Sequence, residues 1–187
     1  MKSSFVSNLR FWVLSALFAA LTAVGAQIRI PMVPIPITLQ TLFVLLAGGF
    51  LGARWGAISQ IFYLFLGLAG LPVFAGESGP MVLLSPTIGY LLAFPLAAFF
   101  CGSLIHGNLR KSTGSLILVY FLSAFIILGL GVVGLYVIQN LYLKTVFSIK
   151  ELFFSGMIIF LPGELLKVVL AAMATQRIPV RQAWQSR

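Results

Sequence analysis

The chain has 187 residues, of which 60% are hydrophobic and 8% are charged, and its mean hydropathy is +1.10. A soluble domain normally has about a quarter of its residues charged, so this composition excludes a water-soluble globular protein and indicates an integral membrane protein. The formal net charge of +9 does not indicate nucleic-acid binding, because the basic residues are scattered at the ends of apolar runs, where they act as topology signals. The apolar runs are continuous rather than alternating, which favours an all-α bundle over a β-barrel.

Six apolar runs predict six transmembrane helices within one membrane domain, residues 1–187. The runs cover about residues 11–28, 38–51, 55–71, 87–105, 115–138 and 152–174. The basic start and the first run also outline a signal peptide, but the apolar segments that follow favour a retained first span. The second and third runs are near or below the roughly 20 residues of a straight crossing, so we expect these two helices to be short, tilted or partly re-entrant.

The distribution of lysine and arginine predicts the orientation of the bundle. An even number of spans places both termini on one side of the membrane, and that side holds eight basic residues against three on the other. The positive-inside rule therefore predicts that both termini are cytoplasmic. The eight are Lys2, Arg10, Arg54, Arg110, Lys111, Arg177, Arg181 and Arg187, and the three are Arg29, Lys144 and Lys150.

Two loops on the predicted outer side, residues 29–37 and 72–86, are rich in proline, glycine and apolar side chains. Three prolines within six positions of the first loop exclude a helix interior. Apolar loops that should face water tend to fold onto the protein, where they either plug the bundle or cover a cavity. We predict that both loops lid a pocket that opens to the outside.

The last apolar run contains a pair of opposite charges, Glu164 and Lys167. A charge inside a membrane span costs about 2.5–3.5 kcal/mol on insertion scales, and an offset of three residues places both side chains on one helix face. One interpretation is a buried ion pair that joins two helices. The other is a site for a polar ligand group, which Pro162 and Gly163 favour because they free or expose backbone groups in mid-span.

Other residues extend this candidate site or indicate a second one. Tyr90 lies beneath the second outer loop as a pocket wall or an interfacial residue, and Gln40 is an amide that caps locally or binds a ligand. The first run holds a doubled small-xxx-small pattern, which allows close helix approach either to a partner or within the bundle. Its members are Ser15, Ala16, Ala19 and Ala20.

The sequence holds no signature of catalysis. It contains no phosphate-binding loop, nucleophile elbow or cluster of histidine with acids. His106 has no nearby His or Cys partner, and Cys101 is alone in the chain, so we expect no metal site, no disulfide, no cofactor and no enzyme activity.

Several segments together resemble the BioY family, the biotin-specific substrate-binding (S) components of energy-coupling-factor (ECF) transporters. They are residues 26–31 (AQIRIP), 36–41 (PITLQT), 63–76, 85–91 (SPTIGYL) and 162–167 (PGELLK). The resemblance implies a six-helix protein of a prokaryotic-type cell membrane, with a pocket open to the outside. It also implies a transmembrane coupling (T) component and two ATP-binding subunits as partners, and docking of the coupling protein near Ala16 and Ala20.

The resemblance implies biotin as the transported ligand and gives the candidate residues roles. We expect Glu164, where the family commonly has aspartate, to accept a ureido N–H of biotin. Lys167 would donate to the ureido carbonyl or stabilise Glu164. Phe74 and Tyr90 would pack on the apolar rings, and Arg29, Gln40 or backbone donors would meet the carboxylate.

Three alternatives remain open from the residues alone. The charged pair would be a proton relay in a secondary transporter or channel, although no inverted repeat is visible. The chain would otherwise be an S component for another vitamin, which the fold would not distinguish, or a structural subunit without a ligand.

Overall fold

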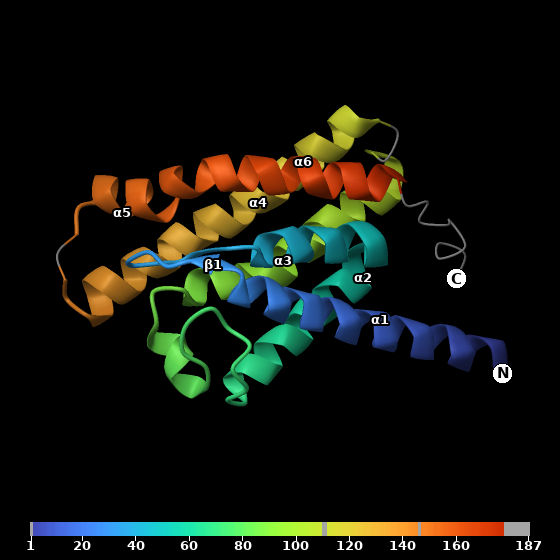
Figure 1. The fold of residues 1–187 in the computed structure, drawn as a ribbon, viewed down its shortest axis with the longest axis horizontal. Helices are drawn as coiled ribbons and strands as arrows, with labels where there is room; N and C mark the ends of the chain where they lie inside the picture. The colour runs from blue at the N-terminus through green and yellow to red at the C-terminus, as the bar shows by residue number, and fades with distance from the viewer. Residues whose placement is uncertain (1, 110–111, 146, 178–187) are drawn as a thin grey trace.

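A computed structural model describes residues 2–109, 112–145 and 147–177 of the chain. These residues form a bundle of helices with one small β-hairpin (Figure 1). Several residues used to predict the orientation lie outside the described part, namely Arg110, Lys111, Arg181 and Arg187.

Six α-helices and two short strands follow one another along the described residues. The helices are α1 (Lys2–Gln27), α2 (Gln40–Leu68), α3 (Ile88–Leu104), α4 (Thr113–Tyr136), α5 (Ile149–Gly156) and α6 (Leu161–Arg177). Strands β1 (Arg29–Ile30) and β2 (Ile37–Thr38) pair antiparallel, with Arg29 opposite Thr38. Short 3-10 helices cover Pro80–Leu84 and Ile158–Phe160, and π-helical turns cover Ile105–Leu109 and Val137–Tyr142.

Within the described residues, five helical segments are long and apolar enough to cross a membrane. They are Leu9–Gln27, Gln40–Leu68, Ile88–Gly107, Thr113–Tyr142 and Ile149–Arg177. The sequence predicted six spans because it counted the two halves of α2 separately.

The two halves of α2 fold back on each other at Gly52, as the teal ribbon shows (Figure 1). Gly52 has a φ of +81°, in the left-handed region that glycine adopts without steric cost. A Cβ placed on Gly56 would lie 2.9 Å from the Cα of Gly48. Eight residues of a straight helix would separate these positions by about 12 Å, so residues 40–51 and 53–68 pack side by side.

The last apolar segment is interrupted in mid-span. Helix α5 ends at Gly156, the backbone of Met157 is not helical (φ −135°, ψ −56°), and α6 begins at Leu161. Pro162 falls in the first turn of α6, where a missing amide hydrogen costs nothing. The break places the N-terminal end of α6, with Glu164 in its first turn, inside the bundle.

One end of the bundle, on the right of Figure 1, holds the start of α1 and the end of α6, and the β-hairpin extends toward the other end. The backbone amide of Leu39, just after the hairpin, donates to the carbonyls of Gly25 (3.1 Å) and Ile28 (3.2 Å). The first loop is therefore tied to the end of α1.

Close packing of α3 on α4 gives a first test of the fold. A Cβ on Gly134 would meet the Cα of Gly89 at 2.5 Å, whereas a Cβ on Gly129 of the same helix meets nothing within 4 Å. We expect Gly134→Ala to destabilise the protein by about 1–3 kcal/mol, because backbone has to move to make room. Gly129→Ala should leave stability unchanged or raise it, because alanine favours helix. Thermal unfolding in detergent measures both, and equal melting temperatures would contradict this packing.

Candidate functional site

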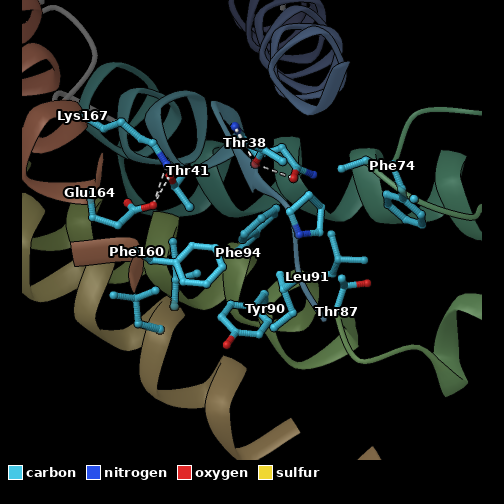
Figure 2. A pocket seen from close by; sticks show the side chains of 17 residues that line it. Thr38, Thr41, Phe74, Thr87, Tyr90, Leu91, Phe94, Phe160, Glu164 and Lys167 are labelled. Atoms are coloured by element: carbon cyan, nitrogen blue, oxygen red, sulfur yellow. Dashed lines mark hydrogen bonds and ion pairs between the residues drawn. The ribbon is translucent and has the colours of Figure 1, made fainter. Parts of the chain in front are cut away.

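A pocket lies between the hairpin, the second loop and helices α2, α3, α4 and α6 (Figure 2). Most polar groups lie at the α2 and α6 side, Thr87 lies at the start of α3, and aromatic and aliphatic side chains form the rest of the wall. The polar lining residues are Thr38, Gln40, Thr41, Thr87, Glu164 and Lys167, and the aromatic ones are Phe74, Tyr90, Phe94 and Phe160.

The charged pair and a threonine form the polar end of the pocket. The Lys167 ammonium lies 2.6 Å from Glu164 Oε1 and donates to Thr41 Oγ1 at 2.8 Å. The Thr41 hydroxyl in turn donates to the same Oε1 at 2.9 Å. Both charged residues are only 4% exposed, so the pair is buried and its hydrogen bonds compensate for lost solvation.

The second oxygen of Glu164, Oε2, is buried and has no hydrogen-bond partner among the residues that the structure describes. The Lys167 ammonium carries three donors, of which two reach Thr41 and Glu164. A buried acceptor without a donor is costly, so the polar end of the pocket is suited to a ligand that brings an N–H or O–H donor.

Gln40 lines the pocket but also holds its wall together. Its Oε1 accepts from the Thr38 hydroxyl at 2.8 Å, and its Nε2 donates to the hydroxyl of Tyr63. Tyr63 donates to the carbonyl of Val73 in the second loop at 3.0 Å. Gln40 thus links the hairpin to the second loop through Tyr63, and it offers a ligand only its remaining donor and acceptor positions.

Tyr90 and Phe74 present apolar surface to the pocket. The Tyr90 hydroxyl points away from the charged pair (Figure 2) and donates to the Gly156 carbonyl at 2.6 Å, which satisfies a free carbonyl at the end of α5. Phe74 is 4% exposed and packs edge-on to Tyr63, with ring centroids 5.2 Å apart. Both rings are fixed by groups outside the pocket.

Arg29, a predicted ligand residue, lies outside the pocket lining. It is exposed on β1, opposite the lining residue Thr38 in the strand pair. The structure therefore brings five of the six predicted ligand residues together and leaves Arg29 one strand away.

The four small residues of the first apolar run face two directions. Ser15 and Ala19 are buried, and the Ser15 hydroxyl donates to the Trp55 carbonyl of α2 at 3.2 Å. Ala16 and Ala20 are exposed on the other side of α1. One half of the pattern thus packs inside the bundle, and the other half is open to a partner or to lipid.

Sequence reasoning missed Thr41 and the two rings Phe94 and Phe160, which line the pocket beside the predicted residues. Thr41 follows Gln40 in one of the quoted segments, but threonine is common in spans and gives no signal by itself. No group of three or more His, Cys, Asp or Glu able to hold a metal occurs among the residues described.

Comparisons with known proteins point to one family. A family model described as the BioY family matches residues 1–184. The probable biotin transporter BioY of Lysinibacillus sphaericus is 39% identical over 89% of this chain and 85% of its own length. The biotin transporter BioY of Thermotoga maritima is 37% identical over 88% and 92%.

One solved structure has a similar fold. It is the crystal structure of the S-component for biotin from an ECF-type ABC transporter. It matches with a TM-score of 0.78 and 25% identity, over 96% of this chain and 95% of that chain.

The buried pair predicts a large stability change in the ligand-free protein. We expect Lys167→Met to destabilise it by about 3–5 kcal/mol, because Glu164 is left as an unpaired buried charge. Adding Glu164→Gln should restore much of the loss, and Lys150→Met, at an exposed lysine of α5, is the control. Thermal unfolding in detergent compares the four proteins. A Lys167→Met protein as stable as the control would show that the pair is not buried as described.

Proposed function

Because the chain belongs to the BioY family, we propose that it captures biotin from outside the cell as the S component of an ECF-type transporter. The names of its relatives and the solved structure of similar fold support this assignment. On this proposal the chain binds and presents its ligand, and it carries no enzymatic activity of its own.

The main observation that supports biotin as the ligand is Glu164 Oε2, which lies beside Lys167 and accepts no hydrogen bond from the described residues. The ureido group of biotin presents an N–H donor and a carbonyl acceptor on adjacent atoms. In our proposal Oε2 accepts the N–H, and the remaining donor of Lys167 reaches the carbonyl. Charge-assisted hydrogen bonds of this kind are strong in a dry pocket, and the pair as a whole is neutral, which suits an uncharged head group.

The rest of the pocket is assigned to the other parts of the ligand. Phe74 and Tyr90 pack on the fused rings, and the carboxylate points toward the loops. There it meets Gln40 or backbone donors of the second loop, and Arg29 attracts it electrostatically from the neighbouring strand. Ala75 and Gly76 of the second loop line the pocket and bring backbone close to it, which supports this direction of the carboxylate.

The proposed arrangement in the membrane has six crossings, with both halves of α2 counted as crossings, and cytoplasmic termini. The fold-back at Gly52 and the shared end of the start of α1 and the end of α6 support it (Figure 1). The hairpin and the second loop then lie outside the cell, where they lid the pocket. The membrane is the cell membrane of a prokaryotic-type cell.

The proposed partners are a transmembrane coupling protein and two ATP-binding subunits, which supply the energy of transport. The coupling protein docks on the exposed side of α1 at Ala16 and Ala20. The small side chains there support this, because they allow close approach of another helix in lipid.

Biotin binding to the purified protein in detergent tests the ligand and the acceptor together. We expect biotin, but neither thiamine nor riboflavin, to give a saturable signal by calorimetry. We expect Glu164→Gln to weaken biotin binding about ten- to a hundredfold, because a charged acceptor is lost. Glu151→Gln changes an exposed acid in the capping box of α5, where glutamine also functions, and it should bind as the parent does.

Two results would contradict the proposal. A folded parent protein that does not bind biotin would remove the assigned ligand. A Glu164→Gln protein that binds biotin as tightly as the parent would remove the acceptor role, while leaving the ligand assignment in place.

If the coupling protein docks at Ala16 and Ala20, variants at these two residues should impair assembly with it and leave biotin binding unchanged. We expect Ala16→Trp with Ala20→Trp to abolish co-purification with the coupling protein, because the bulky rings keep its helix at a distance. Biotin binding by the isolated chain should stay at the parental level. Leu122→Trp, at an exposed position of α4, should assemble normally. Normal assembly of the double variant would place the coupling protein elsewhere.

A further inference from the structure

Thr41 connects the start of α2 to the charged pair on α6. It is 8% exposed, and its hydroxyl lies within hydrogen-bond distance of both charges. A hydroxyl has a single hydrogen to donate and lone pairs to accept with. Because the Lys167 ammonium donates to Oγ1, the hydroxyl hydrogen goes to Glu164 Oε1. Figure 2 shows these contacts as dashed lines on one side of the carboxylate.

The three contacts make the two carboxylate oxygens different. Oε1 receives both the Lys167 ammonium and the Thr41 hydroxyl, and Oε2 receives no donor from the described residues. A lysine and a carboxylate alone do not maintain such a difference, because a rotation of either group lets the ammonium contact both oxygens. Thr41 holds the ammonium on the Oε1 side by accepting one of its hydrogens.

We propose that Thr41 is a positioning residue that keeps Glu164 Oε2 free for the ligand. This rests on the proposed function, in which Oε2 accepts a ureido N–H. Thr41 acts through the charged pair and need not touch the ligand itself. It also reserves one donor of Lys167 for the ligand, since the other two are fixed by Thr41 and Oε1.

Replacing Thr41 by valine keeps the shape of the side chain and removes the hydroxyl. The Lys167 ammonium then loses one acceptor and turns to Oε2, the nearby acceptor without a donor. Both carboxylate oxygens of Glu164 then accept from the Lys167 ammonium, and a ligand has to break an ion-pair contact to bind. Affinity is lost because the Glu164 and Lys167 groups are no longer available, whether or not Thr41 itself contacts the ligand.

The test measures biotin affinity by calorimetry for the full chain in detergent. The set contains the parent, Thr41→Val, Thr41→Ser, Glu164→Gln and the double variant Thr41→Val/Glu164→Gln. We expect Thr41→Val to weaken binding about ten- to a hundredfold, in the range for hydrogen bonds to charged groups. Thr41→Ser, which restores the hydroxyl, should recover most of the affinity.

The double variant separates positioning from a general packing role. If Thr41 acts through Glu164, then Thr41→Val should add little in the Glu164→Gln background, because interacting residues are not additive. Thr22→Val removes a fully buried hydroxyl from α1, outside the pocket, and should bind as the parent does. If Thr41→Val does not fold, Thr41→Ala compared with Thr41→Ser makes the same comparison.

Three outcomes would overturn the inference while biotin binding and the effect of Glu164→Gln remain. They are parental affinity in Thr41→Val, no recovery in Thr41→Ser, and fully additive losses in the double variant. A parent that does not bind biotin, or a Glu164→Gln variant with full affinity, would instead contradict the proposed function.

Discussion

The ion pair between Glu164 and Lys167 is the interaction on which the arrangement of the surrounding helices depends. Two charges buried in an apolar bundle are tolerated when they lie close together and further hydrogen bonds compensate for part of their lost solvation. Thr41 supplies one such partner from α2, and the first turn of α6 adds the favourable field of a helix N-terminus near the carboxylate. The positions of Thr41 and of the first turn of α6 both depend on interruptions of the helices, so the polar centre depends on the fold around it.

Two interruptions of the helices make this centre possible. The break after Gly156 places a helix N-terminus in mid-span, and the reversal at Gly52 brings the second half of α2 back beside the first. Such breaks release backbone groups that have no water to bind. Tyr90 satisfies the Gly156 carbonyl. Among the described residues the buried side-chain oxygens left without a partner are Ser78 Oγ and Glu164 Oε2, and only Glu164 lines the pocket.

The sequence predicted the class of protein and the polar centre because both depend on composition. Long apolar runs and two charges in one of them have few physical explanations. The sequence also left residues 52–54 between two apolar runs, and Gly52, where α2 folds back, lies in that gap. The position of Arg29 depends on strand pairing between segments rich in proline, which no local pattern encodes. In α1 every side is apolar, so the pattern did not reveal that Ser15 faces inward and Ala16 outward.

The placement of α1 also links the two surfaces that the sequence treated separately. Its middle carries the exposed alanines, and its last turn contacts both loops. The Gly25 carbonyl accepts from the Leu39 amide after the hairpin, and the Gln27 side chain donates to the carbonyls of Pro72 and Phe74 at 3.4 Å. The two contacts of Gln27 are long and exposed or only partly buried, so they are weak compared with the buried polar centre. A displacement of α1 would therefore break its contacts with the two loops before it disturbed the ion pair, because the pair lies on α6 and is bonded to α2.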